Sequence, residues 1–283
     1  MTLRNIVAII WACVVSCLLG QVGADDNPAS GPLADREQFR SFYAGKFPSI
    51  EMEAFVLGVY AIDPRLKSQW QALEEFPPYE FLLEDGEALW DEPLKDGSRY
   101  GDCFADHRPI SSFPRFNAKL DEVITLIEAL NACRRDAGEK AYEVDENKMK
   151  SLLAYAQSLA RGQKLRVPDP LGDRERRAYE DGRRAFFTKR GQRNFACADC
   201  HMQSVGKNLR EQKLVPLLGV VQRFPIYGLR WSAFGTLHQR FSGCFEMSYA
   251  KALESQSATY KNLEYFLAVM SKGLPIIGPT TGR

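Results

Sequence analysis

Residues 197–201 read Cys197-Ala-Asp-Cys200-His201, and this stretch decides the fold. Two cysteines separated by two residues and followed at once by a histidine have the spacing used to attach a c-type haem. The thiols add to the haem vinyl groups, and the histidine becomes the proximal iron ligand. Thioredoxin-like redox pairs and zinc sites also contain Cys-x-x-Cys, but neither needs the histidine that follows. The motif therefore predicts a cytochrome c with one covalently attached haem.

The N-terminus agrees with this prediction, because bacterial c-type haem is attached outside the cytoplasm. Arg4 is followed by an uncharged run over residues 6–20 and then by Val22-Gly23-Ala24, which fits the small-residue cleavage rule. We expect a signal peptide over residues 1–24 and a mature periplasmic chain that begins near Asp25. The apolar run is too short for a comfortable membrane span, so no stable span is expected after cleavage.

The seven cysteines also bear on the chemistry. Cys13 and Cys17 lie in the predicted leader, which leaves five in the mature chain. Haem attachment takes two. In an oxidising compartment, the other three predict one disulfide and one unpaired thiol, and an unpaired thiol in a secreted protein indicates chemistry.

Length and charge predict two domains. Residues 25–173 hold 18 basic and 28 acidic side chains, whereas residues 174–283 hold 18 and 8. The opposite charges would help the halves dock, or would place the haem-bearing half in a field that attracts anions or an acidic partner. Turn residues over 167–172 separate the halves. We expect an N-terminal cytochrome c-like domain over 25–172, without haem, and a C-terminal haem-binding domain over 173–283.

Helical periodicity runs through both predicted domains, so the fold class is mainly α. A helix is expected after an N-cap at Asp173 and through Phe187, with another at 259–271. The first half has comparable apolar patterns over 149–159 and from Leu120 to Cys133. Gly182 and Phe186 have the spacing seen where this helix crosses the last helix of a cytochrome c.

The two halves resemble each other, as a duplicated cytochrome c unit would. Cys133 and Cys244 precede similar apolar segments by nearly equal intervals. The run from Cys103 to His107 has the Cys-to-His spacing of a haem motif whose second cysteine is replaced by Asp106. It is either the relic of a haem site or an unrelated loop. In both cases Cys103 and Cys133 form the natural disulfide pair, which leaves Cys244 as the unpaired thiol.

These features resemble the SoxA family, the catalytic subunit of the SoxAX cytochrome of bacterial thiosulfate oxidation. The resemblance covers most of the mature chain. It is carried by the runs 123–133, 158–163, 182–210, 224–225, 235–244 and 260–275.

The resemblance implies a two-domain cytochrome c fold, a SoxX-type haem subunit as partner and a SoxYZ-type carrier protein, with no nucleic acid. It also implies an L-cysteine S-thiosulfotransferase, which joins thiosulfate oxidatively to a carrier cysteine and passes electrons through haem. The absence of a second intact motif indicates the monohaem form. The catalytic cysteine of the family, which ligates the haem iron, falls on Cys244, and an arginine of the site falls on Arg240.

Physical chemistry supports these roles, since a nearby cation lowers a thiol pKa and an arginine offers paired donors to a dianion. Arg240 could instead form a surface ion pair or bind a haem propionate. His238 is a second possible distal ligand, although packing or hydrogen bonding suits it better.

The chain departs from the family after Cys244, where Tyr249 replaces a second arginine and Glu246 adds a negative charge. Altered substrate preference or weakened thiosulfate chemistry would follow. Met247 offers an alternative axial ligand, which would make the protein a His/Met electron-transfer cytochrome without thiosulfate chemistry. A non-catalytic haem-binding or docking subunit is a third possibility.

Overall fold

The computed structural model describes residues 31–104, 109–210 and 212–282, and most of its regular structure is helical. The mainly α prediction is confirmed. The helices are α1 Pro32–Lys46, α2 Val59–Ile62, α3 Pro64–Glu75, α4 Glu80–Asp91, α5 Tyr100–Cys103, α6 Leu126–Asp136, α7 Asn147–Leu159, α8 Asp173–Phe187, α9 Val220–Arg223, α10 Leu237–Met247 and α11 Ala258–Ser271. Tighter or wider helical turns cover Met52–Leu57, Ile110–Ser112 and Asp199–Gln203.

The strands are short and form three small sheets. β1 Arg115–Asn117 pairs antiparallel with β2 Glu122–Ile124, and β3 Asn208–Leu209 pairs with β4 Gln212–Lys213. In the third sheet, β5 Ile226–Gly228 lies between antiparallel β6 Ala233–Gly235 and parallel β7 Thr280–Gly282. The predicted leader, with Arg4, Cys13 and Cys17, lies outside the described residues, as do Asp106 and His107. Within the part of the chain that is described, no helix has the length and apolarity needed to cross a membrane.

From the hairpin before α6 onward, the first half is repeated in the second at an offset of 111 residues. Helices α6 and α10 each start at a threonine N-cap, Thr125 and Thr236, whose hydroxyl accepts the N–H three residues later. Each helix follows a hairpin of the same register, with Phe116 opposite Val123 in one and Tyr227 opposite Phe234 in the other. The described residues thus contain two copies of one supersecondary unit, as a duplication predicts.

Both halves also contain the same close helix crossing. A Cβ at Gly182 on α8 would overlap the carbonyl oxygen of Asn262 on α11, and one at Gly86 on α4 would overlap the carbonyl of Ser151 on α7. Only glycine permits these approaches of helix to backbone. The predicted crossing at Gly182 is therefore present, and Phe186 one turn later is buried in the core.

The connection between the halves is reciprocal. Gly162 N–H donates to Ile276 O and Gly273 N–H to Leu165 O, each at 2.8 Å. The two bonds are equivalent under the offset of 111 residues, because Gly162 corresponds to Gly273 and Leu165 corresponds to Ile276. The segment that follows the last helix of each half therefore pairs with its counterpart, around an approximate twofold axis.

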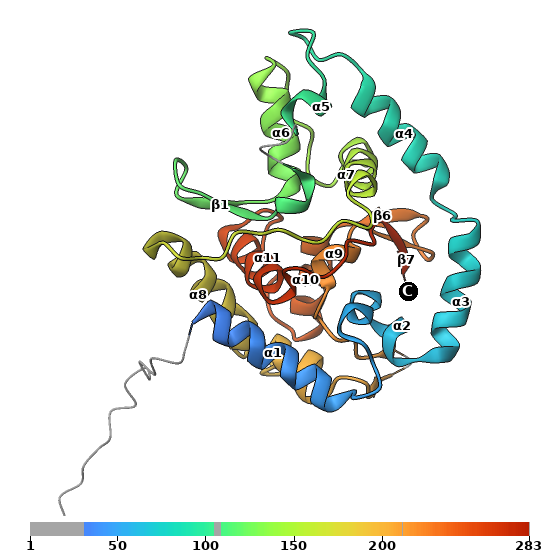
Figure 1. The fold of residues 1–283 in the computed structure, drawn as a ribbon, viewed down its shortest axis with the longest axis vertical. Helices are drawn as coiled ribbons and strands as arrows, with labels where there is room; N and C mark the ends of the chain where they lie inside the picture. Colours follow the sequence, from blue (N-terminus) through green and yellow to red (C-terminus); the bar gives the residue numbers. More distant parts are fainter. Residues whose placement is uncertain (1–30, 105–108, 211, 283) are drawn as a thin grey trace, which may run out of the picture. The chain divides into compact units, whose positions relative to one another are not determined.

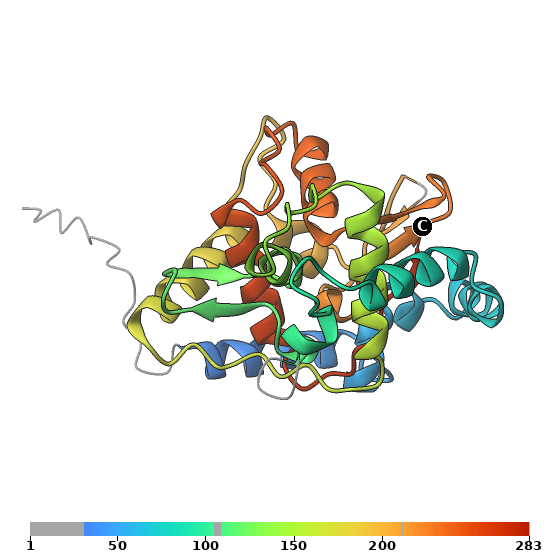
Figure 2. The ribbon, with the colours of Figure 1, turned by 90° about the horizontal axis from the view of Figure 1, so that it is seen from above.

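Helix α1 lies beside α11, and both pack in the same large apolar core as α8 (Figure 1). Arg40 donates to the carbonyls of Met270 and Lys272 at the end of α11. A smaller core around α4, α6 and α7 contains Trp90, Leu130 and Leu152. Figure 2 shows the β1–β2 hairpin lying across α11, which β2 contacts. The domain division at residue 172 stays a prediction.

Two local predictions were wrong in detail. The helix expected from Leu120 begins only at Leu126, because residues 122–124 pair in the hairpin and Thr125 with Glu128 forms a capping box. The N-cap of α8 is Gly172, one residue before Asp173, and the Glu175 carboxylate accepts the Gly172 N–H at 3.2 Å. The predicted helix over 259–271 matches α11 within one residue.

Candidate haem site

The Cys-x-x-Cys-His motif lies at the end of the loop that follows α8. Its first residues are helical and the turn widens over Asp199–Gln203. The Asp199 carboxylate accepts the Ala196 N–H at 2.8 Å, which caps the start of this turn. Cys197 and Cys200 are free thiols, both partly buried, and His201 is buried. One short helical segment thus presents all three groups that would hold a haem.

His201 is held in the tautomer that can bind iron. Its Nδ1 lies 2.8 Å from the carbonyl oxygen of Val215. A carbonyl only accepts, so Nδ1 carries the proton and Nε2 keeps a free lone pair. Burial lowers the pKa of His201 to about 4, which keeps the imidazole neutral. Metal-ligating histidines commonly donate their other N–H in this way.

Helix α10 brings Cys244 to the same site. Cys244 is a partly buried free thiol, and its charge contributes to the raised pKa values of both Cys197 and Cys200, after burial itself. The charge of Cys244 on α10 therefore acts on both thiols of the motif. Burial also raises the pKa of Cys244, and Arg240 acts in the opposite direction. A thiolate at Cys244 therefore needs a further positive charge, which a ferric haem would provide.

Arg240 lies one helical turn before Cys244 and is exposed. Its charge acts on both Cys244 and His201. The five predicted residues, Cys197, Cys200, His201, Arg240 and Cys244, are therefore gathered at one place.

Sequence reasoning missed Arg223, the last residue of α9. The residue is 8 % exposed, and Nη1 of its guanidinium has no hydrogen-bond partner among the described residues. It packs against Gly58, where a Cβ would collide with it. Burial lowers its pKa to about 10, with Arg240 contributing in the same direction. A buried cation without a partner is costly, and the carboxylate of a haem propionate would satisfy it. The residues present thus fit a haem.

The remaining two cysteines form a disulfide in the other half. Cys103, at the end of α5, is bonded to Cys133 on α6, with the Cα atoms 6.0 Å apart. Cys133 is the counterpart of Cys244 under the offset of 111 residues. The cysteine at this position is therefore a free thiol in the second half and part of a disulfide in the first.

Comparison with known proteins agrees with the fold. Residues 85–165 match the family model described as SoxA/TsdA, cytochrome c domain. This stretch lies in the half without the Cys-x-x-Cys-His motif. The chain is 44 % identical to the L-cysteine S-thiosulfotransferase subunit SoxA of Allochromatium vinosum over 253 residues, which cover 89 % of this chain and 90 % of that protein. The chain belongs to the SoxA family.

Other relatives support this membership. The SoxA subunit of Chlorobaculum thiosulfatiphilum is 40 % identical, over 88 % of this chain and 87 % of its own length. The crystal structure of SoxXA from P. pantotrophus superimposes with a TM-score of 0.67 at 23 % identity, over 76 % of this chain and 84 % of that chain. This last likeness shows that the fold is shared.

Tyr249, where the resemblance to SoxA implies a second arginine, contacts an arginine from another loop. Arg193 stacks on the Tyr249 ring, with its Cζ 4.4 Å from the centroid, and donates to the Tyr249 hydroxyl at 3.1 Å. It also donates to the carbonyl of Met247 at 3.1 Å. A guanidinium from the loop before the haem motif thus lies at the C-terminal end of the helix that carries Cys244, where the sequence has lost an arginine.

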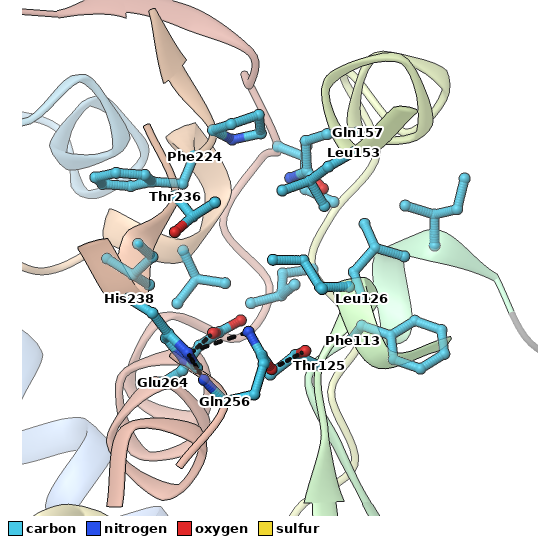
Figure 3. Close-up of a pocket in the computed structure, with 17 residues that line it drawn as sticks. Phe113, Thr125, Leu126, Leu153, Gln157, Phe224, Thr236, His238, Gln256 and Glu264 are labelled. Carbon is cyan, nitrogen blue, oxygen red and sulfur yellow. Dashed lines mark hydrogen bonds and ion pairs between the residues drawn. The ribbon is translucent and has the colours of Figure 1, made fainter. Parts of the chain in front are cut away.

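The other residues able to ligate iron have different surroundings in this SoxA-family chain. His238 is buried in a cavity between the two halves (Figure 3), where its Nδ1 accepts the Gln256 N–H at 3.0 Å. Its Nε2 therefore carries the proton and lies 3.0 Å from Glu264. Met247 is 38 % exposed at the end of α10, and Met270 is fully buried in the core. The expected packing and hydrogen-bonding role suits His238.

Proposed function

We propose that this chain is the catalytic subunit of an L-cysteine S-thiosulfotransferase, carrying one haem c. The covalent attachment would be through Cys197 and Cys200, with His201 and Cys244 as axial ligands. The observation that carries the proposal is the meeting of Cys244 and Arg240 with the haem-attachment motif, in a chain whose close relatives bear this name.

The reaction joins thiosulfate to a cysteine thiol of a carrier protein. A thiol and thiosulfate give the S-thiosulfonate of the cysteine, one proton and two electrons, so a sulfur–sulfur bond forms and both sulfurs together are oxidised. When bound, the haem would accept electrons one at a time, and a partner cytochrome of the SoxX type would then receive them. A SoxYZ-type protein would supply the carrier cysteine.

Each residue of the site has a separate task in this reaction. His201 keeps Nε2 unprotonated through its Nδ1–H bond to Val215. Cys244 would bind the iron through its sulfur, and Arg240 would offer paired donors to the thiosulfate dianion from one turn away. Arg223 would hold a propionate and so neutralise its own buried charge.

The location and domain assignments belong to the same proposal. A disulfide and a haem-attachment motif in one chain support maturation in the periplasm. The first half, with its disulfide, would be the haem-less domain over 25–172, and the second, over 173–283, would bear the haem.

Low-temperature EPR of the ferric protein, together with intact mass, tests the ligand set. We expect one haem and a low-spin histidine–thiolate signal that is lost in Cys244→Ala while the haem is retained. Carrier-dependent thiosulfate oxidation should fall with the signal. Full activity in that variant, or a histidine–methionine signal in the native protein, would overturn the proposal and favour a simple electron carrier.

The role of Arg240 needs a matched control. Arg240→Gln should raise the KM for thiosulfate, because a charged donor pair is lost, whereas Arg230→Gln should leave it unchanged. Arg230 is also an exposed arginine of the second half, in the loop between β5 and β6. Equal effects of the two substitutions would indicate general electrostatics only.

A further inference from the structure

Tyr43 reaches the haem motif from helix α1, 158 residues earlier in the sequence. Its hydroxyl donates to the carbonyl oxygen of His201 at 2.8 Å and accepts the Leu217 N–H at 3.2 Å. The side chain has no exposed surface, and burial raises its pKa, so it is a neutral phenol at physiological pH.

These two bonds join the segments that must stay aligned for iron ligation. The Val215 carbonyl holds the imidazole of His201 through Nδ1, and Leu217 follows two residues later. Tyr43 thus closes a ring of contacts, from the His201 backbone through the phenol to Leu217 and back through Val215 to the imidazole. If residues 215–217 shifted away from the motif, the Nδ1–H bond would lengthen.

Helix α1 fixes the phenol firmly. The Tyr43 ring meets Phe39 edge to face at a centroid distance of 5.2 Å and lies 5.6 Å from Phe55. One turn before Tyr43, Arg40 donates to the carbonyl of Met270 at 3.1 Å, and Lys46 after it donates to Gln203 O, just past the haem motif, at 3.1 Å. The helix is therefore attached to both the last helix and the haem-motif turn.

We propose that Tyr43 is a positioning residue for His201, which sets the orientation and basicity of the imidazole and so the reduction potential of the haem. This inference rests on the proposed haem attachment at His201. A well-aligned Nδ1–H bond makes the imidazole a stronger donor to iron and favours the ferric state. Loss of the phenol should therefore favour the ferrous state.

Spectroelectrochemical titration of the purified haem protein tests this directly. In Tyr43→Phe we expect unchanged haem content and altered low-spin EPR g values. The ferrous-to-ferric ratio at fixed applied potential should rise about threefold, which corresponds to a fraction of the net free energy of one hydrogen bond. The control is Tyr79→Phe, since Tyr79 is also buried and its hydroxyl lies 3.0 Å from a backbone carbonyl, that of Pro279, and 2.8 Å from the Glu74 carboxylate. It should leave the potential and the g values unchanged.

A second variant keeps the test decisive if Tyr43→Phe does not yield folded protein. Incorporation of 3,5-difluorotyrosine at position 43 makes the hydroxyl a stronger donor, so the ferrous-to-ferric ratio should fall. Equal shifts for Tyr43→Phe and Tyr79→Phe, or a ferrous-to-ferric ratio that stays the same or rises in the fluorinated variant, would overturn the inference. A native protein that attaches no haem would instead refute the proposed function.

Discussion

Lys261 of α11 places its ammonium 2.9 Å from the carboxylate of Glu128 on α6, and so forms an ion pair between the two halves of the chain. The same ammonium lies 2.5 Å from Glu122 in β2, and the lysine side chain is only 5 % exposed. Burial lowers the pKa of Lys261, but the hydrogen bonds to the two carboxylates outweigh this effect and raise it overall. The lysine therefore stays charged in the folded protein.

Replacing this lysine by an apolar residue should weaken the contact between the halves. Lys261→Met leaves two carboxylates close together without their cation, and we expect a loss of about 3 kcal/mol in the free energy of unfolding. Urea unfolding of the haem-containing protein measures it. Lys251→Met, at an exposed position of the same half, should change stability by less than about 0.5 kcal/mol. Because the folded pKa is raised, the contribution is complete at neutral pH and is lost only in strong alkali. A Lys261→Met variant as stable as the Lys251→Met control would show that the triad is inert.

The helix crossing at Gly182 gives a second prediction. Gly182→Ala would push α8 away from the Asn262 carbonyl, at a cost of about 2–3 kcal/mol. The control is Gly45→Ala in α1, where a methyl group meets nothing within 4 Å and should stabilise the helix by about 0.5–1 kcal/mol. Thermal unfolding of both variants would separate steric effects from helix propensity. If both changed stability in the same direction, the close approach would be unimportant.

The unpartnered guanidinium of Arg223 predicts opposite effects in the two forms of the protein. Without haem, Arg223→Met removes a buried unpaired charge and should stabilise the chain by about 1–3 kcal/mol. With haem attached, it should destabilise the chain, because a propionate would lose its partner. Denaturant unfolding of the two forms, expressed with and without the haem-attachment machinery, measures the difference. A change of the same sign in both forms would argue against a propionate at this position.

Asp169 predicts a dependence of stability on acid. It pairs with Arg36 of α1 and Lys272 after α11, each at 2.7 Å. Burial raises the pKa of Asp169, but the bonds to Lys272 and Arg36 have the larger effect. The pKa therefore lies below its usual value of 3.8. Its contribution is therefore present at neutral pH and is lost as the pH falls through the lowered pKa.

Asp169→Asn should accordingly cost about 1–2 kcal/mol at pH 7 and progressively less below about pH 4. Unfolding curves over this range are the measurement. Asp181→Asn breaks an exposed pair with Arg184 on α8 and should cost about 0.5 kcal/mol or less. A penalty for Asp169→Asn that grew in acid would contradict the assigned direction.

The haem motif, the main helices and the grouping of Cys244 with Arg240 could be predicted from the sequence, because each depends on local spacing or on a family resemblance. The helix assigned from Leu120 failed because apolar periodicity was followed past Thr125, where a capping box signals a helix start. Tyr43 and Arg223 carry no local signal. The contact of Tyr43 depends on α1 lying beside a motif 158 residues further on, and Arg223 packs against the distant Gly58, which periodicity cannot reveal.

The reciprocal pairing of Gly162 with Ile276 and of Gly273 with Leu165 bears on modularity. Two duplicated units ordinarily keep the capacity to exist alone. Here the segment that closes each unit forms its backbone hydrogen bonds with the other unit. A truncated chain that starts after residue 172 would leave the backbone donors and acceptors of residues 273–276 without these partners. It would also lack α1. We expect that neither copy can be produced as an autonomous fragment, and that the duplication, once paired in this way, could no longer be reversed by simple loss of one copy.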